Sequence, residues 1–245
     1  MKALILAAGY GTRLYSIVKD KPKALLDING RSLINHILEK IIELNGLNEI
    51  IVVTNDKFYG HFQDWAKEQV NISHKITIVN DGTKTPEDRL GSIGDIEFAI
   101  NDQKIDDDLL VVGGDNLFDY NVDDYIAFAQ SKPEAITMGL YDLGNLEEAK
   151  LFGVAAVDAN KKITSFEEKP AQPKSSLVAM CFYYLLRQTL GLVSQYLKET
   201  AVSDTAGDYI RWLYQKHDVY GFTFTGKWYD IGSVEAYNEA KEKFK

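Results

Sequence analysis

The feature that most constrains this chain is an apolar run near its start, residues 3–8, which is interrupted at once by Gly9 and Gly11. The run is too short for a helix, so it predicts a buried strand followed by a glycine-rich loop. Glycine has no Cβ, and the backbone of such a loop can lie against a ligand and present its N–H groups to phosphate oxygens. Arg13 and Lys23 follow with permanent positive charge. Together these residues predict a nucleoside triphosphate site.

Two better-known phosphate loops are absent from the sequence. The dinucleotide-binding fingerprint requires a third glycine where this chain has Leu14, and the P-loop requires Ser or Thr after its GxxxxGK. Residues 221–227 have the glycine spacing of a P-loop but are followed by Trp228. Their alternating aromatic and threonine residues indicate a strand instead.

Beyond the opening loop, the first half of the chain alternates between strand and helix patterns. Strands are predicted over 49–54, 75–80 and 109–112. Helices are predicted between Ser32 as N-cap and Gly46 as terminator, over 56–70 and over 92–101. This order indicates a mainly parallel sheet with helices on both faces, whose ligands bind beyond the carboxyl ends of the strands.

The second half does not keep this alternation. Strand patterns cover 135–140, 153–157, 162–168, 177–185 and 219–225, and helix patterns cover 186–198 and 233–244. Residues 158–161 predict a hairpin turn, and Ser233 is the expected cap of the closing helix. The complete sheet should therefore be mixed.

Charge and cysteine content narrow the function. The formal net charge of −9 argues against a nucleic-acid-binding surface, which would need clustered Lys and Arg. Positive charge is instead local, at Arg13, Lys19, Lys21 and Lys23. Cys181 is the single cysteine, so we expect a core residue rather than a disulfide or thiolate metal site. Without a signal-peptide pattern or an apolar run of membrane-spanning length, we expect a cytoplasmic protein with no membrane partner.

Four sequence blocks resemble those of one enzyme family. Residues 6–14 (LAAGYGTRL) with 21–23 (KPK) resemble the signature of the sugar-1-phosphate nucleotidyltransferases, which include glucose-1-phosphate thymidylyltransferases and their uridylyl, cytidylyl and guanylyl relatives. The blocks 114–116 (GDN), 166–170 (FEEKP) and 228–232 (WYDIG) follow in the expected order. The resemblance implies a Rossmann-like, mainly parallel mixed sheet flanked by helices, in the α/β nucleotidyltransferase (GT-A-like) fold. It also implies one domain over 1–245, with a nucleotide-binding half to about residue 130 and a sugar-binding half from about 131.

The resemblance further implies that a sugar 1-phosphate attacks the α-phosphorus of a nucleoside triphosphate and that pyrophosphate leaves. Such catalysis rests on positioning and charge neutralisation. By resemblance, Arg13 and Lys23 hold the triphosphate and Lys169 holds the sugar phosphate. Asp115 and Asp230 would bind Mg²⁺, which prefers hard oxygen ligands. Taken alone, Asp115 favours a turn and Asp230 could cap a helix, and only the resemblance favours the metal site.

The other site residues are also implied by resemblance. The nucleotide-binding set is Leu6, Ala8, Gly9, Gly11, Thr12, Arg13 and Gly91. The sugar-binding set is Asn116, Gly153, Glu168 and Lys169. Gly153 would allow a close approach of the sugar ring, or would serve a bend in a strand.

The identity of the substrates is less constrained. Residues 81–95 depart from the thymidylyltransferase pattern, and 90–94 (LGSIG) look more like the guanylyl and uridylyl branches. We expect glucose 1-phosphate with dTTP or UTP. The alternatives are a cytidylyl- or guanylyltransferase acting on phosphocholine or mannose 1-phosphate, or a catalytically silent regulatory homologue. The sequence leaves the oligomeric state open, a homo-oligomer included.

Overall fold

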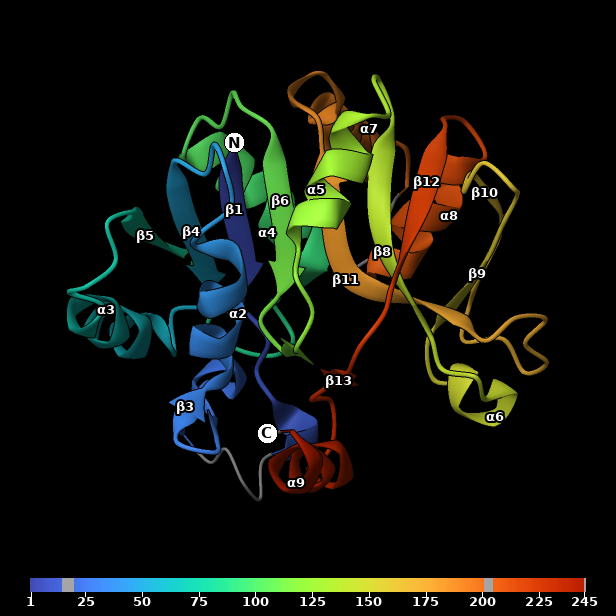
Figure 1. Cartoon of the computed structure of the whole chain (residues 1–245). Coiled ribbons are helices and arrows are strands. Elements are labelled where there is room, and N and C mark those ends of the chain that lie inside the picture. The colour runs from blue at the N-terminus through green and yellow to red at the C-terminus, as the bar shows by residue number, and fades with distance from the viewer. Residues whose placement is uncertain (15–19, 201–204, 245) are drawn as a thin grey trace.

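The structure is a computed structural model that describes residues 1–14, 20–200 and 205–244. A nine-stranded sheet forms its centre (Figure 1). Lys19, one of the cations predicted near the opening loop, lies outside the described residues. Four parallel strands form one side of the sheet in the order β5 (Lys75–Asn80), β4 (Glu49–Thr54), β1 (Lys2–Leu6) and β6 (Leu109–Gly113). The chain moves outward from β1 to β5 and then returns to the other side of β1. The carboxyl ends of β1 and β6 therefore form the crevice where sheets of this type bind ligands.

The other side of the sheet is largely antiparallel. β11 (Leu177–Leu185) runs antiparallel to β6 and to β8 (Ile136–Asp142), and β12 (Val219–Phe224) is parallel to β8. β9 (Gly153–Val157) and β10 (Ile163–Glu168) form the predicted hairpin, and β9 joins β11. The predicted mixed α/β sheet is thereby confirmed.

Helices cover both faces of the sheet because successive strand residues point to opposite sides. On one face, Ala3 and Ile5 share a core with α2 (Leu33–Ile41), α3 (Tyr59–Glu68) and α5 (Asp123–Gln130). On the other face, Leu4 shares a core with α4 (Gly91–Asp102), α7 (Gly191–Glu199) and α8 (Ala206–Tyr214).

The remaining elements complete the described structure. They are 3-10 turns at Thr12–Leu14, Lys23–Leu25 and Arg187–Thr189, the ribbon of β2 (Asp27–Ile28) and β3 (Arg31–Ser32), β7 (Asn116–Phe118), α6 (Leu146–Ala149), β13 (Trp228–Asp230) and α9 (Val234–Lys243). As predicted, Ser233 caps α9, and its hydroxyl accepts the N–H of Ala236. Among the described helices, none has the length and apolar character needed to cross a membrane.

Some predicted element boundaries were wrong. The first strand ends at Leu6, although Ala7 still donates its N–H to Val53 at 2.9 Å. The helix predicted from residue 56 begins at Tyr59, because the Asn55 side chain accepts the N–H of Phe58 and forms a turn. The helix predicted from residue 186 begins as a 3-10 turn, and its α-helical part starts at residue 191.

The capping bond predicted for α2 is absent from the described structure. Ser32 occupies the N-cap position with extended backbone angles, but its side chain makes no capping hydrogen bond. Its hydroxyl oxygen is buried without a hydrogen-bond partner among the described residues. α2 is held instead by its apolar face, on which Ile34, Ile37 and Ile41 are fully buried.

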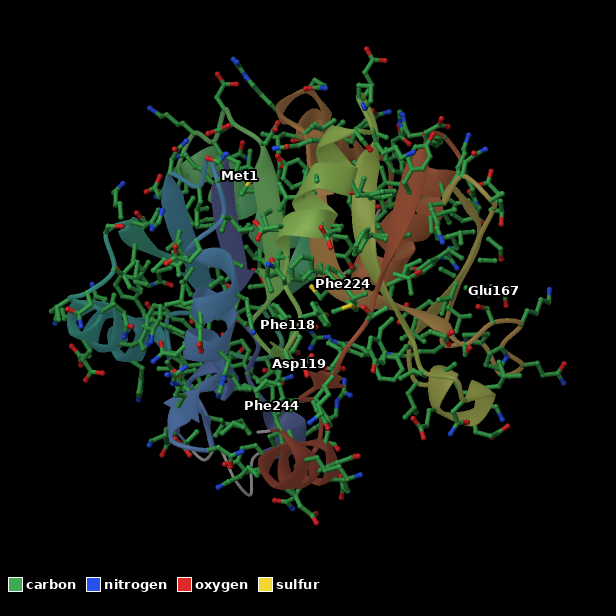
Figure 2. The ribbon with its side chains drawn as sticks, in the orientation of Figure 1. Met1, Phe118, Asp119, Glu167, Phe224 and Phe244 are labelled. Atoms are coloured by element: carbon green, nitrogen blue, oxygen red, sulfur yellow. The ribbon has the colours of Figure 1, made fainter. Side chains whose placement is uncertain are left out.

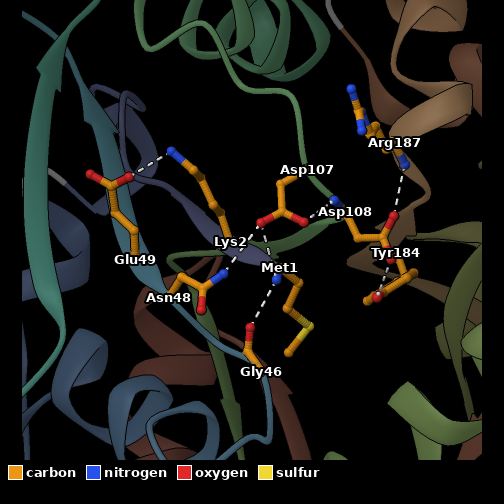
Figure 3. A network of polar contacts seen from close by, with 9 residues as sticks. All are labelled: Met1, Lys2, Gly46, Asn48, Glu49, Asp107, Asp108, Tyr184 and Arg187. Atoms are coloured by element: carbon orange, nitrogen blue, oxygen red, sulfur yellow. Dashed lines mark hydrogen bonds and ion pairs between the residues drawn. The ribbon is translucent and has the colours of Figure 1, made fainter.

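The run of three aspartates at 106–108 joins the two sides of the sheet. Asp108 accepts hydrogen bonds from the backbone N–H of Arg187 at 2.8 Å and from the hydroxyl of Tyr184 at 3.0 Å (Figure 3). The Arg187 guanidinium also bonds both carboxylate oxygens of Asp106 at 2.5 Å. Because these partners lie at the end of β11, the acidic turn is a structural link between β6 and β11.

Candidate active site

The opening loop meets the end of β6 at the crevice. The N–H of Gly114 donates to the carbonyl of Leu6 at 2.9 Å, and a Cβ on Gly114 would lie only 2.8 Å from the same oxygen. The two strand ends can therefore approach this closely only with glycine at 114. In the opening loop, Gly11 has a φ of +62° and accepts the N–H of Leu14 at 2.9 Å, which turns the chain at Arg13.

A small antiparallel ladder brings together two aspartates that are 115 residues apart in sequence. β7 pairs with β13 so that Asn116 lies opposite Asp230, and Ile231 donates its N–H to the carbonyl of Asp115 at 3.0 Å. The indole N–H of Trp228 donates to Oδ1 of Asn116 at 2.6 Å and fixes the ladder. In Figure 1, β13 lies below the carboxyl ends of β1 and β6. Both carboxylates consequently line one cavity.

Cations surround the carboxylate pair. Lys23 Nζ lies 2.7 Å from Oδ2 of Asp115. Burial alone would lower the pKa of Lys23, but the charges of Asp115 and Asp230 outweigh it and hold that pKa above its ordinary value. Burial, and then the charge of Asp115, raise the pKa of Asp230 to about 6, while Lys23, Arg13 and Lys169 act in the opposite direction. The ionised form of Asp230 is therefore incompletely compensated, and a further cation would stabilise it.

The aspartate pair fits a hard divalent cation. Mg²⁺ takes one or two carboxylates and completes its coordination with water and substrate phosphates. Within the described ranges, no group of three or more His, Cys, Asp or Glu side chains could hold a metal ion. Asp115 and Asp230 would thus share the ion with oxygens of a bound substrate.

Three cavities meet at Arg13 and Asp115, which line all of them. The large cavity, about 490 Å³, is lined by the predicted residues Leu6, Ala8, Gly9, Thr12 and Gly91. The central cavity, about 200 Å³, is lined by Gly11, Thr12, Lys23 and Asp230. The side cavity, about 260 Å³, is lined by Asn116, Gly153, Glu168, Lys169 and Asp230. Every residue predicted from sequence to contact a ligand therefore lies in this one region.

In the side cavity, Glu168 sits between two glycines. A Cβ on Gly153 would lie 2.5 Å from the ring of Phe166 and 2.9 Å from Oε2 of Glu168. A Cβ on Gly207 would lie 1.9 Å from the same Oε2 atom. Lys169 follows with a φ of +45° and donates its N–H to Phe152 at 3.0 Å. The Glu168 carboxylate fits at this position because neither glycine has a Cβ that would collide with it.

Two predicted residues have further contacts that bear on their roles. The side-chain amide of Asn116 donates to the carbonyl of Gly113 at 3.1 Å, so both ends of its carboxamide are engaged within the protein. Cys181 lines the large and side cavities. Burial, and then the charge of Asp115, raise the pKa of its thiol well above the ordinary range, which keeps the thiol protonated. The side chain is only partly buried, so the prediction of a core cysteine was wrong.

Several residues that line the cavities were not predicted. Asp81, Arg89 and Asp95 line the large cavity, and Thr205 and Gly207 at the start of α8 line the side cavity. One signal was present for Asp95. It lies on the buried face of α4 with Ile93, Ile96 and Ala99, where an acidic side chain is unusual.

Comparisons with known proteins agree with this geometry. The model of the nucleotidyl transferase family matches residues 2–245. A solved structure from Bacillus anthracis, provisionally assigned as a glucose-1-phosphate thymidylyltransferase and complexed with sucrose, is 24% identical and superposes with a TM-score of 0.80 over 99% of this chain and 94% of its own. A UDP-glucose pyrophosphorylase complexed with UDP-glucose is 24% identical, with a TM-score of 0.83 over 99% of this chain and 97% of its own. The fold matches these structures over almost their whole length, and the family model covers all but the first residue, so the chain belongs to the nucleotidyl transferase family.

Proposed function

We propose that this chain transfers a nucleoside monophosphate from a nucleoside triphosphate to a sugar 1-phosphate and releases pyrophosphate. The observation that carries this proposal is that Arg13 and Asp115 line all three cavities. Joining two phosphate-bearing substrates requires their phosphates to meet beside compensating charge. The proposal assigns the nucleoside to the large cavity, the phosphates to the central cavity and the sugar to the side cavity. Residues 1–130 would chiefly bind the nucleotide and residues 131–245 the sugar.

The proposed reaction is a single displacement. A phosphate oxygen of the sugar 1-phosphate attacks the α-phosphorus and forms a new P–O bond. The bond from the α-phosphorus to the oxygen bridging to the β-phosphate breaks, and pyrophosphate carries away the electron pair. Arg13 and Lys23 would hold the triphosphate and the departing pyrophosphate, and Lys169 would hold the acceptor phosphate in line. Asp115 and Asp230 would hold Mg²⁺, which neutralises phosphate charge when bound.

The sugar contacts follow from the side cavity. Glu168 would accept hydrogen bonds from sugar hydroxyls, Gly153 would let the ring approach the backbone, and Asn116 would shape the surface beside it. The activities for which the two structural neighbours are named favour glucose 1-phosphate with dTTP or UTP as the first pair to test. Because such metabolites are used inside the cell, we place the proposed activity in the cytoplasm.

The direct test is pyrophosphate release with Mg²⁺ over a substrate grid. The donors are dTTP, UTP, CTP, GTP and ATP, and the acceptors are the 1-phosphates of glucose, mannose, galactose and N-acetylglucosamine, together with phosphocholine. We expect one strong combination, and no pyrophosphate when either substrate is omitted. Folded protein that releases none with any pair would contradict the proposal and favour a silent homologue.

A further inference from the structure

Two acidic residues line the large cavity and have no part in the mechanism above. Asp81 follows the end of β5, Asp95 lies in α4, and each is only 7% exposed. Buried acids of this kind are rare unless they are paired, because an isolated ionised carboxylate is costly to remove from water. Their contacts show how they are accommodated.

The two carboxyl groups face each other in the wall of this cavity, close enough for a hydrogen bond, which would require a proton on one of them. Asp81 Oδ1 also accepts the N–H and the hydroxyl of Thr83, at 2.7 and 2.8 Å. Asp95 Oδ1 has no hydrogen-bond partner among the described residues. We call Asp81 and Asp95 the acid pair.

The acid pair belongs to a chain of contacts across the cavity. The hydroxyl of Tyr10, in the opening loop, donates to the hydroxyl oxygen of Thr83 at 3.1 Å. Thr83 donates a hydrogen bond to Asp81, and Asp81 faces Asp95. These contacts link the opening loop to the β5–α4 loop, and that loop to helix α4. Gly91, the first residue of α4, has a φ of +77°, a backbone conformation that favours glycine. Contacts from neighbouring side chains therefore help to orient the start of this helix.

The charges near the pair determine its proton content. Burial, and then the charge of Asp81, raise the pKa of Asp95 to about 8, and burial also raises the pKa of Asp81. Asp88 in the β5–α4 loop acts on Asp81 in the same direction. The other ionisable groups lining the cavity are Tyr10, Arg13, Arg89, Asp115 and Cys181. At neutral pH the pair is one carboxylic acid and one carboxylate, and above pH 8 two charges would face each other.

We propose that the acid pair, by holding one proton between Asp81 and Asp95, fixes the β5–α4 loop and the start of α4 against the base of a bound nucleotide. The inference rests on the proposed function. The base is assigned to the large cavity because that cavity is the most spacious of the three and lacks Lys23 and Asp230, which line the central cavity. Asp95 is then a positioning residue for nucleotide affinity.

The test is equilibrium dialysis of the folded protein with dTTP, UTP, CTP, GTP and ATP, each with Mg²⁺ and without an acceptor, at pH 7 and pH 9. For wild type we expect the Kd of the bound nucleotide to rise about tenfold between the two pH values, because one proton with a pKa near 8 is lost. Asp95→Asn keeps a donor toward Asp81 at every pH. Its Kd should match wild type at pH 7 and stay flat to pH 9. Ionisation of the base would affect both proteins equally.

Three controls test whether the change in nucleotide affinity arises from the acid pair and acts on the base. Asp95→Leu should weaken nucleotide binding at least tenfold at pH 7, because it leaves Asp81 buried and charged. Inorganic tripolyphosphate, which lacks a base, should bind all variants alike. Glu97→Gln, on the same helix but bonded to Ser194 of α7, should behave as wild type.

The inference is overturned if Asp95→Asn shows the same alkaline rise as wild type, if wild-type affinity is flat to pH 9, or if tripolyphosphate binding follows the substitutions. Wild type that binds no nucleotide at either pH would overturn the proposed function, and the inference with it. Nucleotide binding that responds as expected without turnover would support the inference and contradict the proposed reaction alone.

Discussion

Replacing Lys169 tests whether this side chain holds the phosphate of the acceptor substrate. It lines the side cavity and is 56% exposed, so its replacement should not disturb the core. Lys169→Ala should lower kcat/KM for the sugar 1-phosphate by about 10²–10³-fold, because the attacking phosphate loses its positioning charge. The Kd of the nucleoside triphosphate should change less than about twofold. Lys174→Ala, in the loop that follows and paired with Glu167, is the matched control and should be silent. Loss of triphosphate affinity in Lys169→Ala would assign Lys169 to the other substrate.

Asp230 should show opposite effects on activity and on stability. Asp230→Asn removes one proposed metal ligand, so activity should require far more Mg²⁺ or be lost. The same change removes a buried charge that faces Asp115, so the metal-free variant should gain about 1–3 kcal/mol in unfolding free energy at pH 7. Magnesium titration of activity and urea unfolding in EDTA measure the two effects. Unchanged magnesium dependence would remove Asp230 from the metal site.

The site residues differ in how far sequence alone could predict them. Arg13, Lys23 and Asp115 lie in or next to short local motifs, and their place in the cavities follows from the strands that those motifs terminate. Asp81 and Asp95 belong to no such motif, and only the folded chain brings them together in the wall of the large cavity. Local sequence patterns predict which side chains follow the end of a strand. Contacts between side chains of different elements depend on the whole fold.

Glu49 of β4 links three parallel strands at the edge of the sheet. It accepts hydrogen bonds from Lys2 of β1 at 2.7 Å and from Lys75 and Thr77 of β5 at 2.6 Å (Figure 3 shows the bond to Lys2). Burial alone would raise its pKa, but these donors lower the pKa to about 2. An acid with a depressed pKa stabilises the fold above its unfolded pKa of 4.5 and loses that contribution as pH falls toward 2.

Glu49→Gln should therefore cost about 1–3 kcal/mol of unfolding free energy at pH 7 and much less at pH 2. Urea unfolding at several pH values measures the difference between variant and wild type. Glu43→Gln, at an exposed position, is the control and should be neutral throughout. A Glu49→Gln deficit that persists at pH 2 would mean that packing, not charge, explains the effect.

A substitution at the start of helix α8 tests whether the position of the Glu168 carboxylate in the side cavity matters for acceptor binding. Gly207→Ala would place a methyl group where Glu168 Oε2 now lies, since the two would be 1.9 Å apart. We expect the KM for the sugar 1-phosphate to rise at least about tenfold, with nucleotide Kd unchanged, because the displaced carboxylate loses its sugar contacts. Gly191→Ala, at the start of α7, meets nothing within 4 Å and should keep wild-type kinetics. Equal behaviour of the two variants would exclude Glu168 from acceptor binding.

Among the elements, several strands were predicted from the sequence, whereas one helix and the two shortest strands at the site were not. The strands 49–54, 75–80, 153–157 and 177–185 were predicted to the residue, because each is a run of five to nine residues rich in apolar and β-branched side chains. α8 was not predicted, although Tyr209, Ile210 and Leu213 have helical spacing. β7 and β13 have three residues each, too few for a periodic pattern, and their pairing joins segments that are distant in sequence.

One sheet runs through both halves of the molecule, so we expect the halves to unfold as one cooperative unit. β11 continues the sheet from β6, and Phe182 on β11 lies within 5.7 Å of the rings of Phe118 and Phe224 (Figure 2 labels the latter two). We expect urea unfolding followed by far-UV circular dichroism and by tryptophan fluorescence to give one coincident transition. Trp65 lies in the first half, and Trp212 and Trp228 lie in the second. Two separated transitions would show that the halves are independent domains.

Phe182→Ala should lower the unfolding free energy by about 3–5 kcal/mol, because it empties a fully buried position between the halves. Leu146→Ala, at a half-exposed position on α6, should cost far less and serves as the control. Both variants should still unfold in one step. A Phe182→Ala protein with two transitions would identify this contact as the one that couples the halves.

On the proposed roles of Asp115 and Asp230, the ladder between β7 and β13 also sets the point in synthesis at which the chain can become active. The first aspartate emerges from the ribosome with the parallel strands, whereas its partner must wait for another 115 residues of translation. A nascent chain can therefore assemble much of its sheet, and its opening loop, while still lacking the second carboxylate. Fragments that end before β13 would keep the proposed nucleotide-binding loop but lack the second carboxylate, so we expect them to bind a nucleotide without catalysing the reaction.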